Sequence, residues 1–113
     1  MITAILPLPP STNRLYRRYG AHMVKSAEAQ AYEHAAALAL RHIDNPLTCA
    51  VAVTLSVYFP SKAGDLDNRA KKILDCLQGV AYANDKQVTE LHMFRHVDKH
   101  NPRVEVTVSE AQP

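Results

Sequence analysis

The sequence has little cysteine and no long apolar run, and both shortages narrow what the protein can be. Its two cysteines, Cys49 and Cys76, stand in no CxxC pattern, which disfavours a zinc site or a disulfide and favours reduced, buried thiols. No apolar stretch reaches the length that crosses a bilayer. The opening residues, MITAILPLPP, lack the basic region of a signal peptide. We therefore expect a soluble, cytoplasmic protein with no membrane partner.

A large excess of one charge is also absent. The formal net charge is +2, which is too small to identify a partner by itself. The basic residues nevertheless form three groups: Arg14, Arg17, Arg18 and Lys25; Arg69, Lys71 and Lys72; and Arg95, Lys99 and Arg103. Such groups bind a polyanion if they share one face of the fold. They are ordinary solvated surface if they do not, and both interpretations stay open here.

The 113 residues make one domain, residues 1–113, without an internal repeat or a low-complexity segment. Strands are expected at residues 2–6, 47–59, 88–97 and 103–109, with an irregular hairpin at 15–25. Helices are expected at 26–43, capped by Ser26, and from about 65–67 to Gly79. This order predicts an α/β (α+β) fold, in which two main helices pack on a mixed, mostly antiparallel sheet.

The segment GDLDNRAKKILD, residues 64–75, raises the main chemical question. Its apolar residues recur at helical spacing: Leu66, Ala70, Ile73, Leu74 and Leu77. Asp67, Lys71 and Asp75 are four residues apart and so share one flank of the helix. Asp65 precedes Asp67 by two residues.

Two explanations of these carboxylates remain open. They could cap the helix and form i,i+4 ion pairs, each worth only about 0.3–0.5 kcal/mol. However, one cap needs one aspartate, and the segment follows a long strand directly, near a sheet end where sites are commonly built. Asp85 lies in a later irregular segment that could fold back. Carboxylates from two segments, together with a lysine, would suit Mg²⁺ and a phosphodiester substrate.

Three motifs resemble those of the RusA-like Holliday junction resolvases, a family of small dimeric endonucleases. PPSTN, residues 9–13, follows the first strand as the PPSxN element of that family does. DLDN, residues 65–68, with Lys71 beyond it, is similar to its DxDN…K core. NDKQV, residues 84–88, is similar to its third acidic element. The motifs occur in the family's order and span nearly the whole chain.

The resemblance implies a symmetric homodimer that cuts four-way DNA junctions with Mg²⁺, for which Mn²⁺ can substitute. It implies that Asp65, Asp67 and Asp85 bind the metal and that Lys71 is the catalytic lysine. The resemblance assigns no essential role to Asp75, which could orient Lys71. For contact with DNA phosphates, the residues expected from the motifs and the basic groups are Asn13, Arg14, Arg17, Arg18, Arg69 and Lys72.

On this interpretation the protein resolves Holliday junctions by paired incisions during DNA recombination and repair. One alternative is a non-catalytic, junction-binding dimer of prophage origin. Another is a metal-dependent nuclease for other branched DNA, such as flaps or forks, or for RNA. A third is a structural protein whose aspartates are caps and ion pairs.

Overall fold

The computed structural model describes residues 1–111, except for the side chains of Thr12 and Asn13. Its elements in chain order are β1 (Ile2–Leu6), α1 (Thr12–Leu15), β2 (Tyr16–Tyr19), β3 (His22–Lys25), α2 (Ala27–Ala39), β4 (Val51–Phe59), η1 (Asp67–Arg69), α3 (Ala70–Leu77), η2 (Asp85–Gln87), β5 (Val88–Val97) and β6 (Arg103–Glu110).

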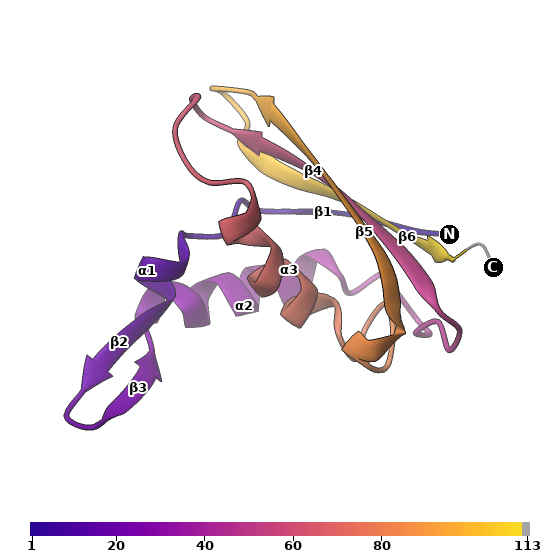
Figure 1. The fold of residues 1–113 in the computed structure, drawn as a ribbon, viewed down its shortest axis with the longest axis horizontal. Helices are drawn as coiled ribbons and strands as arrows, with labels where there is room; N and C mark the ends of the chain where they lie inside the picture. The colour runs from indigo at the N-terminus through magenta and orange to yellow at the C-terminus, as the bar shows by residue number, and fades with distance from the viewer. Residues whose placement is uncertain (112–113) are drawn as a thin grey trace.

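Four strands form one mixed sheet in the order β1-β6-β4-β5. β6 pairs antiparallel with β1 and with β4, whereas β5 pairs parallel with β4. The helices α2 and α3 lie on the same side of this sheet (Figure 1). The predicted mixed, mostly antiparallel sheet with two main helices is confirmed. The pair β2–β3 forms a separate two-stranded sheet that projects from the body (Figure 1).

The alternating burial of residues along β4 shows which face of the sheet packs against the core. Its odd-numbered residues, from Val51 to Phe59, are buried, and the residues between them are half-buried. This is the period of a strand with one face packed and one face partly solvated. The buried face meets Tyr32 and Ala36 of α2 and Ile73 of α3 in a single apolar cluster. Burying each large aliphatic side chain stabilises the fold by about 1.5–3 kcal/mol.

Several element boundaries differ from those expected. Helix α2 ends at Ala39, and residues 40–42 form turns instead of continuing to 43. Strand β4 begins at Val51 instead of 47, because Leu47 makes only an isolated bridge to Tyr82 and the carbonyls of Leu47 and Cys49 accept hydrogen bonds from the Gln87 side chain. The second helix is divided into η1 and α3, and it stops two residues before Gly79, whose φ is +84°.

The cysteines are free, as expected, but they are less buried than expected. Cys49 and Cys76 are unpaired and half-buried, and burial raises the pKa of the Cys76 thiol. Among residues 1–111, no helix is long and apolar enough to cross a membrane.

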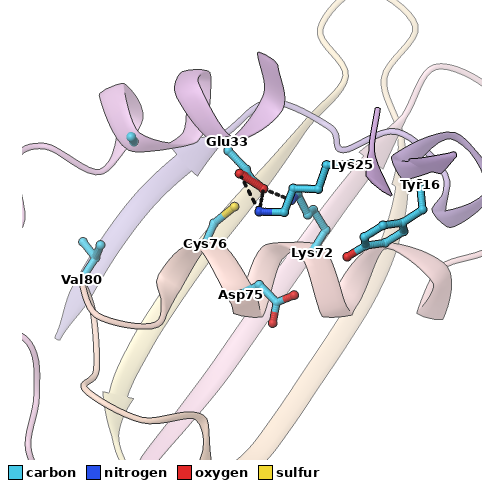
Figure 2. Close-up of a pocket in the computed structure, with 8 residues that line it drawn as sticks. Tyr16, Lys25, Glu33, Lys72, Asp75, Cys76 and Val80 are labelled. Atoms are coloured by element: carbon cyan, nitrogen blue, oxygen red, sulfur yellow. Dashed lines mark hydrogen bonds and ion pairs between the residues drawn. The ribbon is translucent and has the colours of Figure 1, made fainter. Parts of the chain in front are cut away.

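A buried lysine joins the two helices. The side chain of Lys72, on α3, is only 5% exposed, and its Nζ lies 2.7 Å from Oε1 of Glu33 on α2. The same carboxylate oxygen lies 2.8 Å from Nζ of Lys25, at the end of β3. Figure 2 shows both ammonium groups converging on Glu33. The expectation that Lys72 contacts DNA is therefore wrong for this geometry, because its charge is used inside the fold.

Replacing Glu33 by Gln should lower the free energy of unfolding by about 1–3 kcal/mol, since the buried Lys72 ammonium loses its charged acceptor. Replacing Lys72 by Met should cost less than about 1 kcal/mol, because no buried charge is left unpaired. Urea unfolding at pH 7 measures both values, and equal losses in the two variants would contradict the argument.

The stabilisation that Glu33 gains from Lys25 and Lys72 depends on pH in a defined way. Hydrogen bonds from Lys25 and Lys72 hold the pKa of Glu33 below its ordinary value of 4.5. The stability that they contribute is therefore complete above about pH 4.5 and is lost as the pH falls through the lowered pKa. The deficit of Glu33→Gln should shrink over that acidic range.

Candidate metal and phosphodiester site

Two exposed carboxylates follow the end of β4. Asp65 lies in the loop after the strand, and Asp67 is the first residue of η1. Neither η1 nor α3 has a side-chain hydrogen bond at its N-cap. The explanation that these aspartates are helix caps therefore has no support in the geometry. Leu66 between them is half-buried against the core, which leaves both carboxylates on the solvent side.

Lys71 and Asp75 form the expected i,i+4 pair. Nζ of Lys71 lies 3.7 Å from Oδ1 of Asp75, and the lysine side chain is 87% exposed. Within the described part of the chain, no ion pair joins Lys71 to Asp67. The ammonium thus makes a loose, exposed contact with Asp75, four residues away, which is compatible with an orienting role for that residue.

An arginine from the edge strand holds the loop that carries Asp65. Nη1 of Arg95, on β5, donates to the carbonyl of Lys62 at 3.3 Å, and Nη2 donates to the carbonyl of Gly64. The Arg95 guanidinium also lies over the Phe59 ring, 4.3 Å from its centroid. Gly64, with φ +99°, sits against that ring, and a Cβ there would lie 3.1 Å from Phe59 Cε1. The backbone entering Asp65 is thus restrained from both sides.

The sequence analysis did not identify Arg95 as a site residue, although a signal was present. In the parallel register Arg95 pairs with Val57, so its side chain leaves the sheet on the helix-covered face. Leu91, Met93 and Val97 share that face at period two. Arg95 is a charged residue in an otherwise apolar row; it is exposed at the sheet edge, and its guanidinium donates to the loop carbonyls there.

Arg69 is the second guanidinium near Phe59, with Cζ 5.5 Å from the ring centroid. Burial lowers its pKa, Asp65 opposes this shift, and Arg95 adds to it. Its Nε is buried without a hydrogen-bond partner, and Nη1 donates to Asn68 at 3.4 Å. Two positive charges therefore border the loop beside Asp65.

Asp85 lies at the other end of the sheet. Because β4 and β5 are parallel, the start of β5 pairs with the start of β4, Val88 with Val51, whereas Asp65 and Asp67 follow the end of β4 (Figure 1). The nine residues of β4 span roughly 26 Å between these ends. Asp85 does not fold back onto Asp65 and Asp67 within one chain.

Electrostatic contacts separate the carboxylates in the same way. Burial raises the pKa of Tyr82 to about 12, with Asp75 and Asp85 adding to the shift, whereas Asp65 acts on Arg69. Across residues 1–111, no three acidic, His or Cys side chains lie together as a metal-binding group. A single protomer offers Asp65 and Asp67 at one end and Asp85 at the other.

The other residues predicted to contact DNA lie on or near the β2–β3 hairpin. Arg14, Arg17 and Arg18 are exposed, and Arg14 makes a loose contact with Glu28, Nε to Oε1 at 3.8 Å. Asn13 lies in α1, and its side chain is outside the described part of the structure. The geometry thus leaves the three arginines available to a polyanion.

Replacing Gly64 by Ala should lower the free energy of unfolding by about 2–3 kcal/mol, because positive φ and contact with Phe59 both oppose a Cβ. Gly20→Ala is the matched control: its φ is +61° and no heavy atom lies within 4 Å of a Cβ there, so about 1 kcal/mol is expected. Urea unfolding measures both. Trypsin cleavage after Lys62, located by mass spectrometry, should accelerate only in Gly64→Ala, and an unchanged rate would argue against the restrained loop.

Comparison with known proteins places the chain in a family. A family model described as Endodeoxyribonuclease RusA matches residues 7–109. Proteins named crossover junction endodeoxyribonuclease RusA from Escherichia coli K12 and from Enterobacteria phage 82 are each 31% identical to the chain over 109 residues, covering 93% of it and 91% of the relative. A protein of the same name from Shigella sonnei is 30% identical over the same length. Because this family model matches nearly the whole chain, the protein belongs to the RusA family of endodeoxyribonucleases.

Proposed function

We propose that the protein is a Mg²⁺-dependent, structure-specific endodeoxyribonuclease that resolves four-way DNA junctions by paired incisions. One observation carries the proposal: the carboxylates of Asp65 and Asp67 are exposed, neither caps a helix, and both precede Lys71 by a few residues. The chain that carries them belongs to this family. The names of its relatives, crossover junction endodeoxyribonucleases, support the same substrate.

Asp65 and Asp67 would hold the metal. Mg²⁺ prefers carboxylate oxygens, and it is usually bound through one or two carboxylates while substrate phosphates and water complete its shell. Two exposed aspartates at one helix start fit that preference. When bound, Mg²⁺ would supply Lewis acidity toward water and the scissile phosphate; Mn²⁺ is expected to substitute.

Lys71 would act on the charge that develops during cleavage. Its ammonium lies one helical turn beyond Asp67 and is exposed, so a DNA phosphate at the carboxylates comes within its reach. Asp75, 3.7 Å from the ammonium, limits the positions that the lysine occupies. An oriented cation stabilises negative charge on the phosphate in the transition state more than in the ground state.

A second copy of the chain would supply Asp85. β5 is an edge strand of ten residues with three large apolar side chains exposed, Leu91, Phe94 and Val97. A long, apolar, unpaired edge favours pairing with another strand. Antiparallel pairing of two β5 edges about a two-fold axis would bring η2 of one protomer to the end of β5 in the other. Arg95 contacts the Asp65 loop near that end.

The dimer would also account for paired incisions. Two-fold symmetry gives two equivalent sites at a fixed separation, each with Asp65 and Asp67 from one protomer and Asp85 from the other. Opposed strands of a junction would then be cut by symmetry-related sites. Asn13, Arg14, Arg17, Arg18 and Arg69 would contact phosphates, so affinity should fall steeply with salt.

Asp67→Asn should lower the rate of junction cleavage by on the order of 10³-fold, because several kcal/mol of charge stabilisation by the metal is lost. Binding to the junction should be unchanged or tighter, because a negative charge near the phosphates is removed. The assay compares a labelled four-way junction with a linear duplex of the same sequence, in Mg²⁺ and in EDTA.

Asp44→Asn, at an exposed loop carboxylate, is the control and should cut normally. Unimpaired cleavage by Asp67→Asn would refute the assignment of the site. Tight junction binding without cleavage by the unaltered protein would instead indicate a non-catalytic binding dimer. Faster cleavage of flaps or forks would indicate a nuclease for other branched DNA.

Mixed dimers test the shared site. If Asp85 acts in the partner's site, a dimer of one Asp67→Asn chain and one Asp85→Asn chain keeps one intact site and concentrates both changes in the other. Such dimers should nick one junction strand, although each variant alone is inactive. Co-expression with two affinity tags isolates them, and denaturing gels detect the nicks.

Mixed dimers of Asp65→Asn and Asp67→Asn chains are the control. Each site then carries one of the two changes, so no cleavage is expected. Equal inactivity of both mixtures would place Asp85 in the site of its own chain, and full activity of Asp85→Asn alone would place it outside catalysis.

A further inference from the structure

The hairpin formed by β2, its turn and β3, residues 16–25 and here called the arm, projects from the body of the protein (Figure 1). Its strands pair only with each other, and all eight strand residues are exposed. An isolated two-stranded hairpin is at best marginally stable in water. The arm therefore needs support at its base, and its exposed surface has no role in the core.

The base of the arm is firmly anchored. Leu15, just before β2, is 4% exposed, and Ser26, just after β3, is 6% exposed. The Ser26 amide donates to the carbonyl of Leu15 at 2.9 Å, and Oγ of Ser26 donates to the carbonyl of Arg14 at 2.6 Å. The same oxygen accepts from the amide of Ala29 at 3.1 Å, as the cap of α2. One buried serine thus closes the hairpin and starts the helix.

The arm is also tied toward α3. Lys25, its last residue, pairs with Glu33, which in turn holds the buried Lys72 of α3 (Figure 2). A pocket of about 290 Å³ lies beside these groups, with Tyr16, Asp75 and Cys76 in its lining. Because α3 carries Lys71 and follows directly from Asp67, these contacts set the direction of the arm relative to the candidate site.

The surface of the arm combines positive charge with exposed apolar groups. Arg17, Arg18 and Lys25 lie on it, and residues 14–25 include no acidic residue. The exposed fractions of its large side chains are 78% for Tyr19 and 64% for Met23. In the antiparallel register Arg18 faces Met23 and Tyr19 faces His22, next to the turn at Gly20. Nε of Arg18 donates to the carbonyl of Gly20 at 3.3 Å, which supports that turn.

This combination suits a nucleic acid with accessible base faces. Arginines beside phosphates supply affinity without sequence preference, and an aromatic ring stacks on any unstacked base. An intact duplex offers no such base face, whereas strand exchange at a branch point does. A two-stranded ribbon also has a width that DNA grooves accept, and apolar side chains are known to act as wedges between bases.

We propose that the arm enters the branch point of the DNA and that Tyr19 at its tip stacks there on a base. The inference rests on the proposed function and extends it, since it names what distinguishes branched from linear DNA. The anchored base would transmit the position of the branch to α3, so that the phosphate presented to Asp65 and Asp67 lies at a fixed distance from the crossover.

The test uses the full chain with Asp67→Asn, so that DNA is bound without being cut. A four-way junction carries 2-aminopurine either at the branch or within one arm of the duplex, and fluorescence is read at saturating protein. Binding should change the fluorescence at the branch position several-fold and leave the internal position nearly unchanged. Tyr19→Ala added to this protein should abolish the change at the branch, and Tyr19→Phe should restore it.

Affinity and oligomeric state complete the test. Tyr19→Ala should weaken junction binding by roughly 5- to 150-fold, the equivalent of one stacked base, and leave duplex binding unchanged. Arg17→Gln is the matched control in the arm: it should lower the salt dependence of binding on both DNAs but keep the branch fluorescence at saturation. Light scattering should give the same molar mass for all variants.

Three results would overturn the inference. One is unchanged branch fluorescence when the protein with Tyr19 binds, another is equal fluorescence with Tyr19→Ala, and the third is loss of self-association in Tyr19→Ala. Failure of the proposed function is distinguishable, because the unaltered protein would then fail to cut the four-way junction in Mg²⁺, or would cut flaps or forks faster, whatever the branch fluorescence. A junction that is cut normally without a branch signal would reject only the role of the arm.

Discussion

The parallel pairing of β4 and β5 determines how the chemical groups of this protein are arranged. Its register runs from Val51 with Val88 to Phe59 with Val97. A parallel ladder requires a crossover, here the segment containing α3, that returns the chain to the starting end of the sheet. The carboxylates before α3 and the one after it therefore lie at opposite ends of the strands. An antiparallel β5 would have placed Asp85 close to Asp65 at the same sheet end.

Within one protomer Asp85 is separated from Asp65 and Asp67, and β5 is an edge strand of the described sheet. The edge strand β5 presents both its backbone and three apolar side chains, and its far end is joined through Arg95 to the loop of Asp65. If two copies pair along this edge about a two-fold axis, as proposed, the end that carries Asp65 and Asp67 would meet the end of the partner that carries Asp85. Catalysis and dimerisation would then depend on the same strand, and neither would need a large movement of the loop. Restraint of Gly64 by Arg95 and Phe59 favours an organised loop, which lowers the reorganisation needed when the substrate binds.

The number of basic residues does not determine which of them are exposed to a ligand. Lys72 and Arg69 are close in sequence, but Lys72 is buried against Glu33, whereas Arg69 borders the loop of Asp65. Lys25 belongs to the arm and still uses its ammonium on Glu33. The internal pairs hold the helices and the arm together, whereas Arg14, Arg17 and Arg18 are exposed. A modest net charge is compatible with polyanion binding because several acidic side chains pair with Lys25, Lys72 and Arg103.

Much of this protein followed from the sequence alone. The alternation in β4, the Ser26 cap and the apolar stripe of α3 are local patterns, and each was readable because period and burial are linked over a few residues. The sequence also placed Asp65, Asp67 and Lys71 within one short segment, and the resemblance to the RusA-like resolvases, not the helical period, assigned them to one site. Tertiary structure decided the rest. It buried Lys72, placed Arg95 against the loop of Asp65, and separated Asp85 from Asp67. These outcomes depend on the direction and register of strands that are distant along the chain, and hydrogen bonds between strands leave no period in the sequence that would reveal them.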